Sequence, residues 1–174
     1  MKLNLGSGNV LLKGWVNIDI SPVADFQQDL TQPLKFADNS IDYIYSEHFL
    51  EHIEYDQAVN LIKECFRVLK KGGVIRIATP DLTHLVNKYK GNWKDQDWLS
   101  HDDYKFIQTK GMMINHAFRG WGHKYLWNKE DLARVFIMAG FNDPTTKYLG
   151  ISLYDELMCL ETRLDSTLIM EGVK

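Results

Sequence analysis

Cysteine is scarce in this chain of 174 residues, and long apolar runs are absent from it. Two cysteines, Cys65 and Cys159, are too few for a disulfide framework and form no C-x-x-C pair, so we expect a reducing, cytoplasmic setting. No apolar run approaches the roughly 18 residues that a membrane-spanning helix needs. Met1–Asn4 leads directly into polar sequence, so we predict neither a membrane span nor a signal peptide.

An excess of positive charge is also lacking. Twenty Lys and Arg stand against 23 Asp and Glu, which gives a formal net charge of −3. From Asp81 to Glu130 eight basic residues face six acidic ones, without the basic stripe that nucleic-acid binding requires, so no nucleic-acid partner is predicted. With no repeat, low-complexity tract or Pro/Ser-rich linker, residues 1–174 are expected to form one domain.

Short apolar runs alternate with turns over the first 80 residues. We expect strands at Lys2–Leu5, Trp15–Ile20, Asp25–Leu30, Ile41–Tyr45 and Val74–Ala78. Strands that alternate with a helix are typical of a parallel sheet covered by helices. The tail from residue 145 onwards is expected to add strands, of which the last covers Ser166–Val173.

Two segments carry helix patterns. Between Asp56 and Lys70 the apolar residues fall on one face of an amphipathic helix, and Gly72-Gly73 supplies a stop signal. A second helix is predicted over Asn128–Ala139, with Asn128 as its N-cap and Gly140 at its end.

The most informative motif is a glycine turn after the first strand, Leu5-Gly6-Ser7-Gly8, followed by Asp19 at the end of the second strand. Glycines there let a ligand approach the backbone, and an acid at the end of the next strand can accept hydrogen bonds from ribose hydroxyls. The motif differs from the dinucleotide fingerprint, because position 11 is leucine and Asp19 lies only 13 positions after Gly6. There is also no P-loop.

Several motifs then occur in an order that resembles the class I S-adenosylmethionine-dependent methyltransferases, in particular small members found with polysaccharide-building genes. These motifs are Leu3–Gly8, Gly14–Asp19, Asp29-Leu30, Leu34–Asp42, Ser46–His52 and Arg67–Gly73, with weaker continuation at His123–Trp127 and Ala139–Phe141. The resemblance implies an α/β fold: a Rossmann-like, doubly wound, mostly parallel sheet with an antiparallel C-terminal strand. It also implies S-adenosyl-L-methionine as the cofactor.

The same resemblance implies a set of cofactor-binding residues. Gly6 and Gly8 would pass under the methionine part, Asp19 would hold the ribose, Asp29 and the Leu30 amide would read the adenine edge, and Ser46 would line the wall beside the methionine group. The full predicted set is Leu5, Gly6, Ser7, Gly8, Asp19, Ile20, Asp29, Leu30, Ser46 and His48. The short gap before Asp19 leaves little room for the helix that usually follows the glycine turn.

The segment His48-Phe49-Leu50-Glu51-His52 also fits H-x-x-E-H, the inverted zinc-protease pattern. On a helix, histidines at i and i+4 face one metal ion, so a zinc-dependent hydrolase is an alternative. A catalytic zinc site needs a third protein ligand, and no later helix offers an obvious glutamate for it. We therefore predict no metal site and keep the hydrolase as the rival hypothesis.

Methyl transfer requires an acceptor held in line with the methyl group and, for a hydroxyl, removal of its proton. The candidate bases are His48, His123 and His116, with Glu47 and Asp81 as weaker candidates. His84 and His101 stand in polar sequence and are expected to be solvated.

The stretch 86–130 has poor periodicity and four of the five tryptophans, and we interpret it as an acceptor-binding lid or insertion. Core filling is the alternative role for its aromatic residues. We therefore predict methyl transfer to a small-molecule acceptor, with a saccharide hydroxyl favoured. Another alternative is a protein that binds or cleaves S-adenosylmethionine without methyl transfer. The sequence does not indicate an oligomeric state.

Overall fold

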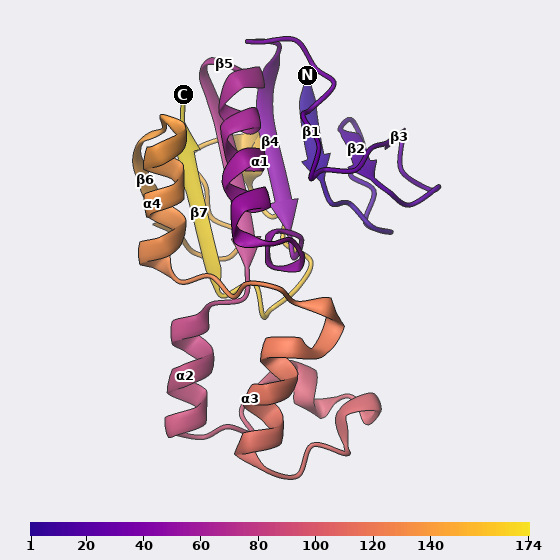
Figure 1. The fold of residues 1–174 in the computed structure, drawn as a ribbon, viewed down its shortest axis with the longest axis vertical. Coiled ribbons are helices and arrows are strands. Elements are labelled where there is room, and N and C mark those ends of the chain that lie inside the picture. The colour runs from indigo at the N-terminus through magenta and orange to yellow at the C-terminus, as the bar shows by residue number, and fades with distance from the viewer.

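The computed structural model describes all residues, 1–174, and has a seven-stranded sheet with a smaller helical part beyond one end of it (Figure 1). The order across the sheet is β3-β2-β1-β4-β5-β7-β6. The first five strands are parallel, and β7 is antiparallel to both β5 and β6. The strand bounds are β1 Lys2–Leu5, β2 Val16–Asp19, β3 Phe26–Gln27, β4 Ile41–Glu47, β5 Leu69–Thr79, β6 Asn142–Lys147 and β7 Leu168–Val173. The predicted mostly parallel α/β sheet with an antiparallel C-terminal strand is confirmed.

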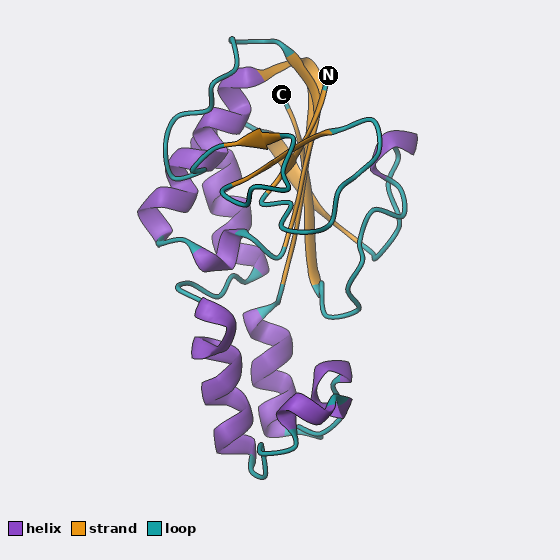
Figure 2. Cartoon of the chain, turned by 90° about the vertical axis from the view of Figure 1, so that its right-hand side faces the viewer, coloured by secondary structure: helices purple, strands orange, loops and turns teal.

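Two of the four α-helices cover one face of the sheet, and the other two form the helical part (Figure 2). Helices α1 (Tyr55–Val68) and α4 (Lys129–Ala139) pack on the sheet, whereas α2 (Leu82–Lys90) and α3 (Lys110–Arg119) pack on each other. No helix follows the glycine turn between β1 and β2, as the short gap in the sequence predicts.

The covering helices form where their apolar periodicity and capping residues predict them. Glu54 and Gln57 make a capping box at the start of α1, whose apolar side enters a core of 25 buried residues. The Asn128 side chain accepts a hydrogen bond from the backbone N–H of Asp131 at the start of α4, and Gly140 ends that helix in the left-handed conformation. Both predicted helices are therefore present.

The prediction that Gly72-Gly73 stops the first helix is wrong. Helix α1 ends at Val68, and Leu69 already has extended backbone and pairs with Ile41. Gly73 lies inside β5, where a Cβ atom would come within 2.9 Å of the Lys70 carbonyl oxygen. The glycines thus let a long strand bend between Leu69 and Val74, where its register with β4 shifts.

The opposite face of the sheet is covered by loops, mainly those around residues 10–15 and 148–165, in place of helices (Figure 2). Arg76 of β5 is fully buried there and pairs with two buried carboxylates, Glu161 and Glu171. The Arg76 guanidinium also donates to the carbonyl oxygens of Ile151 and Tyr148. Arg76 therefore fastens the C-terminal loop onto this face.

The helical part contains two helices that the poor periodicity of 86–130 did not predict. Asp81 caps α2 and Thr109 caps α3, each by accepting a backbone N–H with its side chain. Trp127 is an exception within this stretch, because it is fully buried in the main core and stacks on Tyr55. Core filling, the alternative role for these aromatic residues, thus applies to Trp127.

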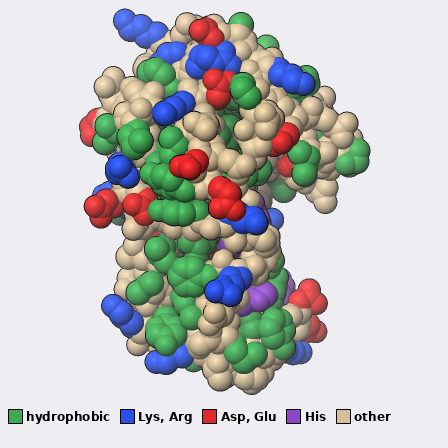
Figure 3. All heavy atoms as spheres, viewed as in Figure 1, with side chains coloured by type: hydrophobic (Ala, Val, Ile, Leu, Met, Phe, Trp, Pro, Cys, Tyr) green, Lys and Arg blue, Asp and Glu red, His purple; other side chains and the backbone are tan.

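None of the helices has the length and apolar character that crossing a membrane requires. Lys and Arg side chains are interspersed with Asp and Glu on the face shown in Figure 3, and histidine side chains are visible near the junction of the two parts.

Candidate functional site

The glycine turn lies at the carboxyl end of β1, where Gly6 and Gly8 both have positive φ angles of 67° and 50°. A Cβ atom on Gly6 would overlap the side chain of Phe49, only 2.3 Å away. A Cβ atom on Gly8 would meet nothing within 4 Å. Gly6 is therefore required for close packing of Phe49, while Gly8 leaves the turn open to a ligand.

Asp19 lies beside this turn at the end of β2, as predicted. Its carboxylate accepts the backbone N–H groups of Gly8 and Ser21, each at 2.9 Å. The neighbouring Ile20 is exposed. Asp19 thus fixes the shape of the glycine turn, and its half-buried carboxylate retains lone pairs for a ligand.

Asp29 lies farther along the same edge, after β3, and its side chain is exposed. Its carboxylate accepts hydrogen bonds from the Thr31 hydroxyl and backbone N–H, which lower the pKa of Asp29. Leu5 and Leu30 are buried in the core.

Two serines near the turn have buried hydroxyl groups without a hydrogen-bond partner. They are Ser7, inside the turn, and Ser46, on the adjacent strand β4. Unpaired buried hydroxyls are uncommon in proteins and indicate a missing polar partner. Together with the open turn and the Asp19 carboxylate, they fit a polar, nucleoside-like ligand.

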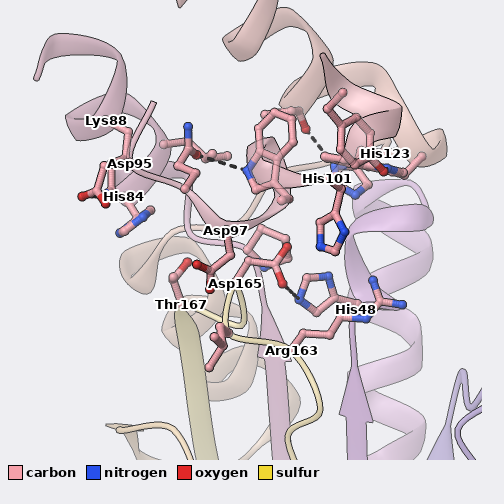
Figure 4. A pocket seen from close by; sticks show the side chains of 18 of the residues that line it. His48, His84, Lys88, Asp95, Asp97, His101, His123, Arg163, Asp165 and Thr167 are labelled. Atoms are coloured by element: carbon pink, nitrogen blue, oxygen red, sulfur yellow. Dashed lines mark hydrogen bonds and ion pairs between the residues drawn. The ribbon is translucent and has the colours of Figure 1, made fainter. Parts of the chain in front are cut away.

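A cavity of about 830 Å³ lies between the end of the sheet and the helical part (Figure 4). Residues after β4 and β5 and the loop before β7 form the sheet side, and segments of the helical part form the other side. Its main polar and aromatic lining residues are His48, His52, His84, Lys88, Asp95, Asp97, Trp98, His101, Asp103, Tyr104, Trp121, His123, Thr162, Arg163, Asp165 and Thr167.

His48 lies at the carboxyl end of β4 and lines the cavity. Its backbone has a positive φ of 49°, and its ring is 6% exposed. Nδ1 lies 3.3 Å from Oε1 of Glu51, and Nε2 lies 3.7 Å from Oδ1 of Asp165 (Figure 4). Burial lowers the pKa of His48 to about 4, so the imidazole is neutral at pH 7.

Glu51 lies beneath His48 and is completely buried. Oε2 accepts the Thr79 hydroxyl at 3.1 Å, whereas Oε1 has no hydrogen-bond partner. Burial raises the pKa of Glu51 to about 7.

The remaining predicted bases have different surroundings. His123 lines the cavity, with its ring centre 5.0 Å from that of His52. His116 does not line the cavity; it lies in an aromatic cluster with Trp98, Tyr104 and Trp121. Besides His48, the candidate bases are His123, His116, Glu47 and Asp81. Of these four, only His123 lines the cavity.

Glu47 and Asp81, the weaker candidate bases, have structural roles. The Glu47 carboxylate accepts hydrogen bonds from Thr162, Arg163 and Ser166, and so holds the loop that forms one wall of the cavity. Asp81 caps α2.

Sequence reasoning missed several cavity residues, among them Arg163 and Asp165 of the loop before β7 and two histidines. His84 and His101, expected to be solvated, both line the cavity, and burial lowers the pKa of His84. Their polar neighbours in the sequence gave no signal, because the cavity forms only when separate turns of the helical part come together.

The H-x-x-E-H segment does not form the helix that the hydrolase hypothesis requires. His48 has a left-handed backbone, and only Leu50–His52 forms a short 3₁₀ turn. The donor atoms that converge belong to Glu51, His52 and His123, and His48 lies outside this group.

Comparisons with known proteins agree with this geometry. Residues 8–77 match a family model described as a methyltransferase domain. A probable S-adenosylmethionine-dependent methyltransferase of Mycolicibacterium smegmatis is 37% identical over 60 residues. That match covers 34% of this chain and only 23% of the relative's length.

Solved structures with the same fold align with almost the whole chain. A methyltransferase from Archaeoglobus fulgidus, described as S-adenosylmethionine-dependent, has a TM-score of 0.60 at 15% identity, with 99% of this chain and 85% of that chain covered. A Thermotoga maritima protein described as a possible histamine N-methyltransferase has a TM-score of 0.57 at 16% identity, with coverages of 99% and 81%. At these identities the likeness shows the fold.

Proposed function

We propose that this chain is a class I S-adenosylmethionine-dependent methyltransferase and that it methylates a polar small molecule held in the cavity. The observation that carries the proposal is the position of His48 and Phe49. Phe49 packs on the glycine turn, and the adjacent His48 lines the cavity. A cofactor at the turn and an acceptor in the cavity would therefore meet beside these two residues.

The cofactor side of the proposal uses six of the ten predicted residues, and Gly6 is not among them because Phe49 packs against it. Gly8 and the Ser7 and Ser46 hydroxyls would surround the methionine part of S-adenosylmethionine, and Asp19 would accept the ribose hydroxyls. Asp29 and the Leu30 amide would bind the adenine edge. When bound, this cofactor supplies an electrophilic sulfonium methyl group.

The acceptor side favours a hydroxylated molecule such as a saccharide. Trp98, Tyr104 and Trp121 line the cavity with flat aromatic faces, which suit sugar rings, while the histidines and carboxylates offer hydrogen-bond partners. We assign the lid role to the helical part within residues 86–130. His48 would take the proton of the acceptor hydroxyl at Nε2. This atom is buried and has no hydrogen-bond partner, so the Asp165 carboxylate, 3.7 Å away, would move aside when the acceptor binds.

The direct test is methyl transfer from radiolabelled S-adenosylmethionine to pools of saccharides. A parallel pool of amines is included because four aspartates line the cavity. We expect label in an acceptor of the saccharide pool. If the cofactor binds and breaks down but no acceptor is labelled, the alternative of a cofactor-cleaving protein is favoured. If only amines are labelled, the acceptor is not a hydroxyl.

Asp19→Asn should weaken S-adenosylhomocysteine binding by about 1–3 kcal/mol, because it leaves a ribose hydroxyl without a full acceptor. The substitution keeps the side-chain size but replaces the acceptor of the Gly8 or the Ser21 N–H group by an NH2 donor, so the comparison between ligands, and not the affinity alone, tests the ribose contact. Calorimetry with S-adenosylhomocysteine and its 2′-deoxy and 3′-deoxy analogues measures the effect. The deoxy analogues should bind less tightly than the parent to the native chain but about equally to the variant. If the affinity difference between S-adenosylhomocysteine and its deoxy analogues were the same in the variant as in the native chain, the ribose would not bind at Asp19. Asp56→Asn, at an exposed aspartate, serves as the control.

Trp98→Ala should raise the KM for the acceptor about tenfold or more, because it removes the apolar surface that the acceptor ring would cover, and burying a large apolar side chain is worth about 1.5–3 kcal/mol. The affinity for S-adenosylhomocysteine should not change. Trp93→Ala, which also removes a tryptophan of the helical part but not one that lines the cavity, is the matched control. Equal KM values for both variants would argue against the lid role.

A further inference from the structure

One group of side chains at the junction of the two parts takes no part in the cofactor binding or the proton removal proposed above. Glu51 and His52 belong to the short turn after β4, and His123 follows the kinked turn Gly120–Gly122 of the helical part. One donor atom from each of the three lies within 4.8 Å of the other two. Residues that are distant in the sequence thus present two imidazoles and one carboxylate to a common point.

The carboxylate in this group has one oxygen without a partner. Glu51 is 0% exposed, and its Oε1 has no hydrogen bond. A buried carboxylate is expected to be paired with a cation or fully hydrogen-bonded. No Lys or Arg forms an ion pair with Glu51, and the nearest imidazole, that of His48 with Nδ1 at 3.3 Å, is neutral at pH 7. A cation at the common point would supply the missing partner.

His123 is oriented as a metal ligand would be. Its Nδ1 lies 2.8 Å from the Ala117 carbonyl oxygen, which can only accept, so the proton is on Nδ1 and the lone pair is on Nε2. Metal-binding histidines typically donate their other ring N–H to a carbonyl or carboxylate in this way.

The backbone holds the two halves of the group together. The carbonyl oxygen of Glu51 accepts the N–H groups of Lys124 and Tyr125, at 2.7 and 3.2 Å. These bonds fix the segment that carries His123 beside the turn that carries His52. The ligand atoms of a tetrahedral zinc-type site lie roughly 3.4 Å apart, given metal–ligand bonds of about 2.0–2.1 Å. The three donors, which lie within 4.8 Å of one another, would move closer together when the cation binds.

We infer that Glu51, His52 and His123 form a binding site for one divalent transition-metal cation, open to the cavity. Two imidazoles and a carboxylate suit zinc, cobalt or nickel better than magnesium or calcium. Three protein ligands leave a fourth position, and both histidines line the cavity, so that position faces the space assigned to the acceptor. The set differs from the H-x-x-E-H hydrolase arrangement, because His48 is not a member.

The test is titration of the tag-free chain with Co²⁺, without S-adenosylmethionine or acceptor, followed by competition with Zn²⁺. We expect one Co²⁺ per chain with the intense visible absorption of a tetrahedral site. His52→Gln and His123→Gln should each weaken binding about 100-fold or more, since even outer-shell changes cost 10- to 100-fold. His101→Gln, at an exposed histidine of the same cavity, should bind as the native chain does.

Absent binding, an octahedral spectrum from weak surface sites, or equal affinity in the His52 and His123 variants would overturn the inference. The metal titration needs no cofactor, whereas S-adenosylhomocysteine calorimetry needs no metal. The two experiments can therefore fail independently: the titration tests only the metal site, and the calorimetry tests only the cofactor site on which the proposed methyl transfer depends. Circular dichroism of each glutamine variant establishes that it is folded before the titration is read.

Discussion

Arg76→Met is expected to destabilise the fold by about 3–5 kcal/mol, because it leaves two buried carboxylates without their cation. Arg76 is 0% exposed, and the Glu161 and Glu171 side chains with which it pairs are 0% and 3% exposed. The same guanidinium donates to the carbonyls of Ile151 and Tyr148, so the loop on the helix-free face of the sheet also loses its attachment. Urea denaturation measures the change as a lower midpoint.

The matched control is Arg134→Met, which removes an arginine that makes only an exposed hydrogen bond to the Tyr55 hydroxyl. Its effect should stay within about 0.5 kcal/mol. A triple variant, with Glu161→Gln and Glu171→Gln added to Arg76→Met, should recover part of the loss because it removes the uncompensated charges. If Arg76→Met and Arg134→Met had equal midpoints, Arg76 would not be what holds the loop to the sheet.

Much of the sheet and its covering helices could be predicted from local sequence. The apolar spacing of α1 and the caps of α4 are local signals, and each predicted the bounds of its helix to within two residues. The strand β5 was harder, because Gly72-Gly73 after a helix pattern usually marks a stop. Its extension back to Leu69 depends on pairing with Ile41, which is a long-range contact that the local pattern does not contain.

The candidate site also has a part that local sequence predicts and a part that it does not. The glycine turn and Asp19 are neighbours along two adjacent parallel strands, so their meeting follows from the strand order alone. The cavity wall does not, since His84 and His101 reach it only through the packing of short turns in the helical part. The approach of His123 to His52 likewise depends on the kink at Trp121, whose φ of 57° no sequence pattern announces.

His48→Asn should lower the rate of methyl transfer by about 10²- to 10⁴-fold, the usual contribution of a general base. Asparagine is chosen because the backbone at this position has a φ of 49°, which asparagine tolerates better than most residues do. The affinity for S-adenosylhomocysteine should change little if the proposed cofactor contacts, from the glycine turn, Asp19 and Ser46, hold the ligand without the His48 ring that the sequence also predicted as a contact. The fall should therefore appear in kcat.

A structural role for His48 would give a different result. If the ring only supports Glu51 and Asp165, the asparagine variant should lose thermal stability, and transfer should fall in step with the folded fraction. If the ring removes the acceptor proton, imidazole added to the folded variant should restore part of the rate, because the cavity opened by the shorter side chain lies beside the acceptor. Rescue without a change in melting temperature would assign the base to His48, and a rate unaffected by the substitution would remove His48 from the chemistry.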